Sequence, residues 1–184
     1  MKTKIFTFLF FLLIMGMNLT AQDNNSSSEK YGNTLNLGLG IGYYGYLGHS
    51  TPTIHLNYEF DVLRNFTLAP FISVYSYRRF YYNNGYRYYS RHTVIPVGAK
   101  GTYYFDELLS ANSKWDFYAA GSLGFAIVSS RYDDGYYYDK KHYRHPNPLY
   151  LDLHIGAEYH INSKLGVFLD LSSGMSTIGL AIHQ

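Results

Sequence analysis

The sequence predicts an all-β fold in which eight antiparallel strands close into an up-and-down barrel. Three observations support this prediction: apolar side chains alternate with small or polar ones, aromatic residues are abundant, and turn-like connections separate the alternating segments. The chain of 184 residues contains 22 Tyr and 12 Phe. Both residue types favour β-strands over helices, so the composition agrees with the alternation.

The first four strands are predicted from period-two alternation, which places every second side chain on one face of a strand. The segment 35–43 alternates leucine, isoleucine and tyrosine with asparagine and glycine, a spacing that a helix cannot produce. The segments 54–62, 66–75 and 95–105 repeat the pattern. Their apolar faces comprise Leu35, Leu37, Leu39, Ile41 and Tyr43; Ile54, Leu56, Tyr58, Phe60 and Val62; Phe66, Leu68, Pro70, Ile72 and Val74; and Ile95, Val97, Ala99, Gly101, Tyr103 and Phe105.

The second half of the chain continues the alternation in the segments 115–127, 149–161, 165–172 and 177–183. Connections after the second, fourth and sixth strands (64–65, 106–114 and 162–164) are mostly short. Those after the third and fifth strands (78–91 and 131–148) are long, and short turns that alternate with longer loops are typical of membrane barrels. The apolar faces comprise Trp115, Phe117, Ala119, Gly121, Leu123, Phe125 and Ile127; Leu149, Leu151, Leu153, Ile155, Ala157, Tyr159 and Ile161; Leu165, Val167, Leu169 and Leu171; and Ile178, Leu180 and Ile182.

The N-terminus predicts export. Lys2 and Lys4 precede a short apolar run, and Ala21 stands before the expected cut, so residues 1–22 are interpreted as a signal peptide. Residues 23–33 form a polar, flexible segment, and 34–184 form the barrel domain. Without the two leader lysines, 13 basic residues balance 13 acidic ones, so nucleic acid is not expected as a partner. The absence of cysteine excludes disulfides.

The character of the two strand faces distinguishes a membrane barrel from a soluble one. The face opposite the apolar one combines glycines, such as Gly38 and Gly98, with isolated charges, which suits a narrow lumen. Aromatic residues gather toward the strand ends, as in membrane-interface girdles. We therefore expect a transmembrane barrel. The alternative is a soluble periplasmic or secreted lipocalin-like barrel that binds a small ligand in an apolar interior.

Four segments carry a family resemblance: IPVGAKGTYYF (95–105), WDFYAAGSLGF (115–125), LDLHIGAEYHINSKLGVFLDL (151–171) and the ending IGLAIHQ. They resemble the small outer-membrane β-barrels common in Bacteroidetes, which share the architecture of OmpA- and OmpX-type barrels. The resemblance implies a location in the cell outer membrane with both termini in the periplasm. It also implies contact with outer-membrane lipid and lipopolysaccharide and insertion by the barrel-insertion machinery.

The inward face is expected to hold a polar network. Lys100 is an inward base that faces several acids, and we predict that it pairs with Glu59, Glu158 or Asp170, since a lone charge in a dry lumen is costly. Inward histidines, among them His154, complete the network. An alternative use of these histidines and carboxylates is a cation or proton site, but no metal and no cofactor are expected. The inward residues of this set are Glu59, Lys100, His154, Glu158 and Asp170, with His55, His160 and His183 on the same face.

An enzyme is not expected. A lipid-modifying barrel would need a serine, a histidine and an acid within hydrogen-bond reach. His160 and Ser163 are close in sequence but fall at a periplasmic turn. Ser122, Ser172 and Ser173 are expected to have no inward histidine at a matching depth.

The outer connections are rich in tyrosine, a residue that gives a large contact area at low entropy cost. We expect them to form two surface tongues, 78–91 and 131–146, that contact an extracellular glycan or protein. Bulky inward aromatic residues should fill the bore, so a structural or surface-binding role is expected rather than a wide pore. The candidate contacts are Tyr82, Tyr86, Tyr89, Tyr137 and Arg144.

Overall fold

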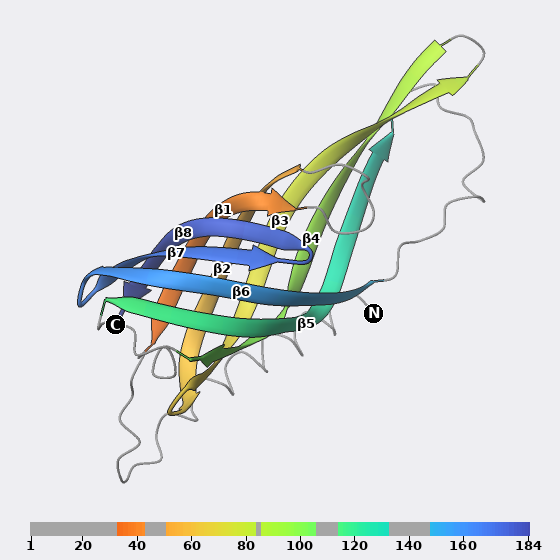
Figure 1. The fold of residues 1–184 in the computed structure, drawn as a ribbon. Coiled ribbons are helices and arrows are strands. Elements are labelled where there is room, and N and C mark those ends of the chain that lie inside the picture. The colour runs from red at the N-terminus through yellow and green to blue at the C-terminus, as the bar shows by residue number, and fades with distance from the viewer. Residues whose placement is uncertain (1–32, 43–50, 84–85, 106–113, 133–147) are drawn as a thin grey trace.

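The chain folds as a closed barrel of eight antiparallel strands (Figure 1), which confirms the predicted fold class. Strands follow one another around the barrel in chain order, and the last strand pairs with the first. Their bounds are β1 Thr34–Gly42, β2 Thr51–Leu63, β3 Phe66–Asn83, β4 Tyr86–Tyr104, β5 Trp115–Tyr132, β6 Leu149–Asn162, β7 Leu165–Ser172 and β8 Met175–His183. The computed structural model describes residues 33–42, 51–83, 86–105, 114–132 and 148–184.

The predicted signal peptide and all but the last residue of the predicted flexible segment lie outside these described residues. Within the described residues, no helix has the length and apolar character needed to cross a membrane.

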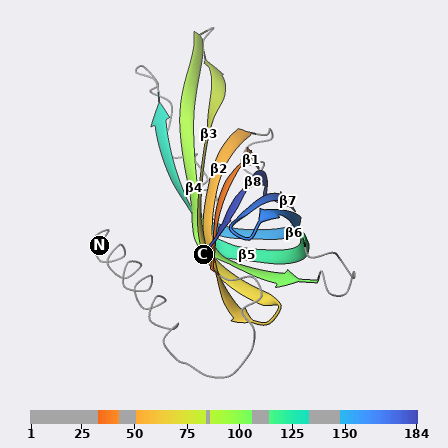
Figure 2. The ribbon, with the colours of Figure 1, turned by 90° about the vertical axis from the view of Figure 1, so that its left-hand side faces the viewer.

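The barrel has two unlike ends (Figures 1 and 2). One, here named the turn end, carries the tight β2–β3 and β6–β7 turns. At the other, here named the hairpin end, β3, β4 and β5 rise well beyond the remaining strands. The β3–β4 ladder continues from Arg78↔Arg91 to Asn83↔Tyr86. The outer connection over 78–91 is thus a β-hairpin, as its Asn83-Asn84-Gly85 turn signal predicts, and the expected end of the third strand at residue 75 is too early. The aromatic and arginine-rich segments pair with each other, which satisfies their backbone N–H and C=O groups.

Apolar residues cover the outside of the barrel and polar residues line the inside, which confirms the predicted sidedness. Leu153 is 74% exposed and Leu39 is 65% exposed, whereas the alternate residues Asp152 and His154 are buried. The soluble lipocalin-like alternative is wrong, because that architecture directs its apolar face inward.

Aromatic rings fill the bore. Tyr150 is 1% exposed, and Tyr118 packs so closely over β6 that a Cβ atom at Gly156 would overlap its ring. The cavity found inside has a volume of ≈ 10 Å³, about the space of one water molecule. The buried inward aromatic residues are Phe71, Tyr75, Tyr77, Tyr104, Tyr118, Tyr150 and Phe168.

Candidate functional site

A buried ion pair lies at the centre of the lumen. The Lys100 ammonium on β4 donates to Asp170 Oδ2 on β7 at 2.5 Å, and both side chains are 4% exposed. Tyr118 donates to the same oxygen at 3.1 Å, and its ring lies 4.9 Å from the Lys100 nitrogen. Of the three predicted partners, Asp170 is thus the one that Lys100 contacts. The residues come from β4, β5 and β7, so the pair connects strands that are not neighbours in the sheet.

His154 extends this pair into a row. Its Nδ1 contacts Asp170 Oδ1 at 2.7 Å, and its Nε2 contacts Ser122 Oγ at 2.8 Å. The expectation that Ser122 has no inward histidine at its depth is wrong, because the offset between β5 and β6 places Ser122 opposite Asp152, two residues from His154. Connectivity of this kind is that of a Ser-His-Asp triad.

Catalysis by such a row needs room for a substrate carbonyl beside the serine, and donors for its oxyanion. Ser122 is 5% exposed, and the interior cavity is lined by other residues. Its backbone neighbours are paired in the β4–β5 and β5–β6 ladders, where N–H groups are already used. The row therefore has the connectivity of a triad without the access that acyl transfer requires.

Glu59 anchors a second part of the network, nearer the turn end. Its Oε1 accepts a hydrogen bond from the Asn36 amide at 2.8 Å. Its Oε2 accepts from the Thr67 hydroxyl at 2.7 Å and from the Tyr104 hydroxyl at 2.8 Å. Three donors offset the cost of burying this carboxylate, as charge-assisted bonds in a dry interior do. The small cavity lies between Glu59 and the Lys100–Asp170 pair.

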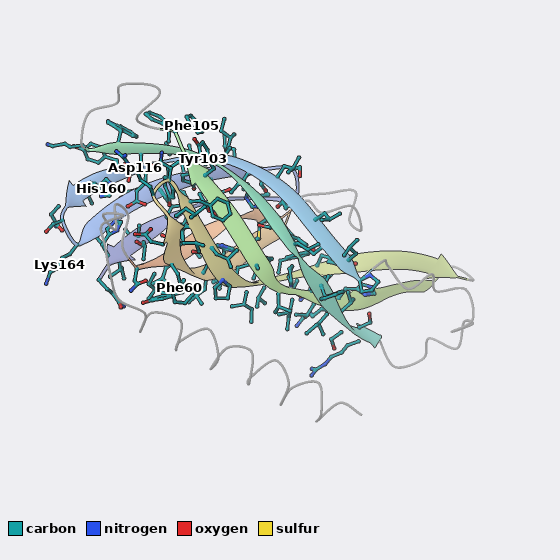
Figure 3. The ribbon with its side chains drawn as sticks, turned by 90° about the horizontal axis from the view of Figure 1, so that it is seen from below. Phe60, Tyr103, Phe105, Asp116, His160 and Lys164 are labelled. Atoms are coloured by element: carbon teal, nitrogen blue, oxygen red, sulfur yellow. The ribbon has the colours of Figure 1, made fainter. Side chains whose placement is uncertain are left out.

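A third group, here named the turn-end cluster, comprises Glu158 and His160 on β6, His183 on β8 and Asp116 on β5. His183 Nε2 lies 2.7 Å from Glu158 Oε1, and His160 Nε2 lies 2.7 Å from Asp116 Oδ2. The two imidazole rings lie 4.9 Å apart between centroids. Figure 3 shows Asp116 and His160 close together at the same end as Lys164. Glu158 thus belongs to this group and not to the Lys100 pair.

Asp152 is an inward acid that the set of lumen residues predicted from the sequence did not include. Its Oδ1 accepts from the Ser173 hydroxyl at 2.7 Å and from the Gly174 N–H at 2.8 Å, while Oδ2 accepts from Tyr150 and Ser172. These bonds fix the β7–β8 turn at the hairpin end. The alternation of β6 directs Asp152 inward, between the outward Leu151 and Leu153, but the spacing alone does not show that the β7–β8 turn folds over it.

An aromatic belt surrounds the outside of the turn end. Trp115 stacks on Phe117 at 5.9 Å and contacts Tyr159 at 5.0 Å between ring centroids. Tyr103 is 47% exposed, and Figure 3 shows it with Phe60 and Phe105 at this end. Rings with an apolar body and a polar edge favour the boundary between lipid and water.

The proposed surface contacts divide between two segments. Tyr82, Tyr86 and Tyr89 lie in the paired β3–β4 extension, where Tyr82 pairs with Arg87 and Tyr89 with Phe80. The placement of their side chains lies outside what the structure describes. Tyr137 and Arg144 belong to 133–147, which is also outside the described residues.

No family model matches the chain, and no curated protein matches it. Several solved structures are similar to it at low identity, among them the following three. Neisserial surface protein A has 11% identity and a TM-score of 0.47, over 83% of this chain and 96% of that one. Ail, the attachment invasion locus protein of Yersinia pestis, crystallised with the heparin analogue sucrose octasulfate, has 12% identity and a TM-score of 0.44, over 82% and 95%. A de novo designed transmembrane β-barrel has 14% identity and a TM-score of 0.46, over 81% and 93%.

Proposed function

We propose that this chain is an outer-membrane barrel, exported by a signal peptide at 1–22, with both termini in the periplasm and the hairpin end outside the cell. The observation that carries the proposal is the combination of an apolar exterior, an aromatic belt and a polar interior. An exterior of this kind is stable in lipid and costly in water. Outer-membrane lipid and lipopolysaccharide would surround it, and the barrel-insertion machinery would place it there.

Labelling of engineered cysteines tests this orientation, since the chain has no cysteine of its own. A membrane-impermeant maleimide should label Asn84→Cys, at the hairpin tip, in intact cells. It should label Ser163→Cys, in the β6–β7 turn, only after the outer membrane is permeabilised. Recovery of the protein in the soluble fraction, or the reverse labelling pattern, would overturn the proposal.

Within that membrane, we propose a structural or surface-binding role, without a wide pore and without an enzymatic step. The filled bore supports this, because an eight-stranded barrel has just enough interior for its side chains and porins need about 16 strands. Purified protein in planar bilayers should give no large stable conductance. Large, long-lived current steps would refute the filled bore.

The binding surface that we propose is the pair of Tyr-rich tongues at the hairpin end, with Tyr82, Tyr86, Tyr89, Tyr137 and Arg144 as contacts to a glycan or protein. Support comes from the paired β3–β4 extension, which carries three of these tyrosines beyond the barrel. A triple Tyr→Ser variant at 82, 86 and 89 should lose signal on glycan arrays or on whole-cell adhesion. The matching triple Tyr→Phe variant keeps the rings and should retain most of it. If removal of both tongues changes no interaction, surface binding fails and the structural barrel remains.

A further inference from the structure

The turn-end cluster has the ligand set of a transition-metal site. Two imidazole nitrogens and one carboxylate oxygen, from His160, His183 and Glu158, lie within 4.8 Å of one another. This His₂Glu set with one open position is a known arrangement for Zn²⁺. Ligand atoms about 2.1 Å from a tetrahedral Zn²⁺ ion are about 3.4 Å apart, so small side-chain movements would bring these three to that spacing.

The outer nitrogens of both rings are already held. His160 Nε2 contacts Asp116 Oδ2 at 2.7 Å, and a carboxylate can only accept, so this nitrogen carries the proton. His183 Nδ1 lies 3.0 Å from Thr34 Oγ1, a hydroxyl that can donate to this nitrogen in the metal-free form and accept from it when Nε2 binds a metal. A histidine whose far N–H is bound to a carboxylate or hydroxyl is the usual form of a metal ligand, because that bond fixes the ring and its tautomer.

The inner nitrogens, His183 Nε2 and His160 Nδ1, both face Glu158. Oε1 of that residue lies 2.7 Å from His183 Nε2 and 3.9 Å from His160 Nδ1. Without a metal, the short contact is a hydrogen bond that His183 Nε2–H donates to the Glu158 carboxylate. This proton bridges only the short contact, whereas a Zn²⁺ ion that replaced it would also bind His160 Nδ1.

The surrounding sheet has space for the Glu158 carboxylate and leaves the two histidines accessible to an ion from the end of the bore. Glu158 lies over β7 at Gly166, where a Cβ atom would overlap its Oε1. The side chains of His160 and His183 are 24% and 13% exposed at the end of the bore, so an ion can reach them from that side. The site also joins β6 to β8 across β7, beside the β8–β1 pairing that closes the barrel.

We propose that Glu158, His160 and His183 bind one Zn²⁺ ion at the turn end, with Asp116 and Thr34 orienting the two histidines. The sequence alone predicted no metal. The ion would bridge the strands on either side of β7 and stabilise barrel closure, in addition to the proposed membrane and surface roles.

The test uses the full mature chain, without a His tag, folded in detergent and depleted of metal by a chelator. Isothermal titration with Zn²⁺ should show one equivalent bound and a rise in melting temperature. Bound Co²⁺ should give the strong visible absorption of a tetrahedral site. His160→Gln and His183→Gln should each abolish both signals, and Asp116→Asn should weaken Zn²⁺ binding by about 10–100-fold while both ligands remain.

The matched control is His92→Gln, since His92 is also inward and hydrogen-bonded to a serine, Ser130, at the opposite end. It should bind Zn²⁺ as the unmodified chain does. Each variant is first checked for folding by heat-dependent gel mobility and strand content. If a ligand variant fails to fold, the Zn²⁺ affinity of Asp116→Asn decides the test. The proposal would be overturned if the unmodified chain showed no saturable Zn²⁺ binding, or if Asp116→Asn and both ligand variants bound Zn²⁺ as tightly as the unmodified chain.

Discussion

Removing the Lys100 ammonium should destabilise the barrel more than any surface charge does. In Lys100→Met the side chain keeps its length, but Asp170 stays buried, at 3% exposed, without its cation. Breaking one partner of a buried pair costs about 3–5 kcal/mol. His154 and Tyr118 still contact the carboxylate, so we expect the lower end, about 3 kcal/mol, in the free energy of unfolding.

Trp115 gives the assay, because it is the sole tryptophan and lies in the aromatic belt at 39% exposed. Its fluorescence should follow unfolding by urea in lipid vesicles, with the free energy obtained by linear extrapolation. Lys164→Met is the matched control, since Lys164 lies exposed in the β6–β7 turn, and it should change stability by less than about 0.5 kcal/mol.

A double variant separates the ion pair from general damage to packing. Lys100→Met combined with Asp170→Asn removes both charges. The double variant should cost clearly less than the sum of the two single variants, because it leaves no unpaired charge buried in the bore. Additive costs, or a Lys100→Met barrel as stable as the Lys164→Met control, would refute the reasoning.

Two further substitutions test the bore and the exterior. Gly156→Ala should cost about 1–3 kcal/mol, because the added methyl group overlaps Tyr118, whereas Gly121→Ala meets its nearest atom at 3.9 Å and should be nearly neutral in the same unfolding assay. Ile178→Lys, near the middle of β8 and 57% exposed, should cost about 2–4 kcal/mol in vesicles. Leu63→Lys, at the turn end of β2, should cost about 0–1 kcal/mol, and equal costs for the two lysines would contradict a membrane-spanning exterior.

The strands and their sidedness could be predicted because alternation is a local signal. A strand such as β6 records in its own residues which side chains face lipid and which face the lumen. The exception was the β3–β4 extension. The apolar alternation stops after Val74, although pairing with β4 continues to Asn83. Hydrophobic periodicity is a signal of one-sided burial, so it does not show where backbone pairing ends.

The interior contacts could be predicted only by type. The alternation of inward and outward side chains predicted that Lys100 faces several acids. Which acid it contacts depends on how the closed barrel offsets β4 from β7, and the register of every strand between them sets that offset. The offset between β5 and β6 likewise brings His154 to Ser122, which the alternation alone could not indicate. The turn-end cluster depends on closure as well, since His183 is the last residue of β8 and reaches Glu158 only across β7.

The β3–β4 extension also sets how far its last pair, Asn83↔Tyr86, lies from the barrel. Six residue pairs continue from Arg78↔Arg91 to Asn83↔Tyr86. At about 3.3 Å per residue, this ribbon places its last pair about 17 Å from the first of these pairs. An unpaired loop of the same length would sample many heights and would lose that freedom on binding. A paired ribbon has lost most of that freedom during folding, so the proposed partner would meet its last pair at a set distance from the barrel.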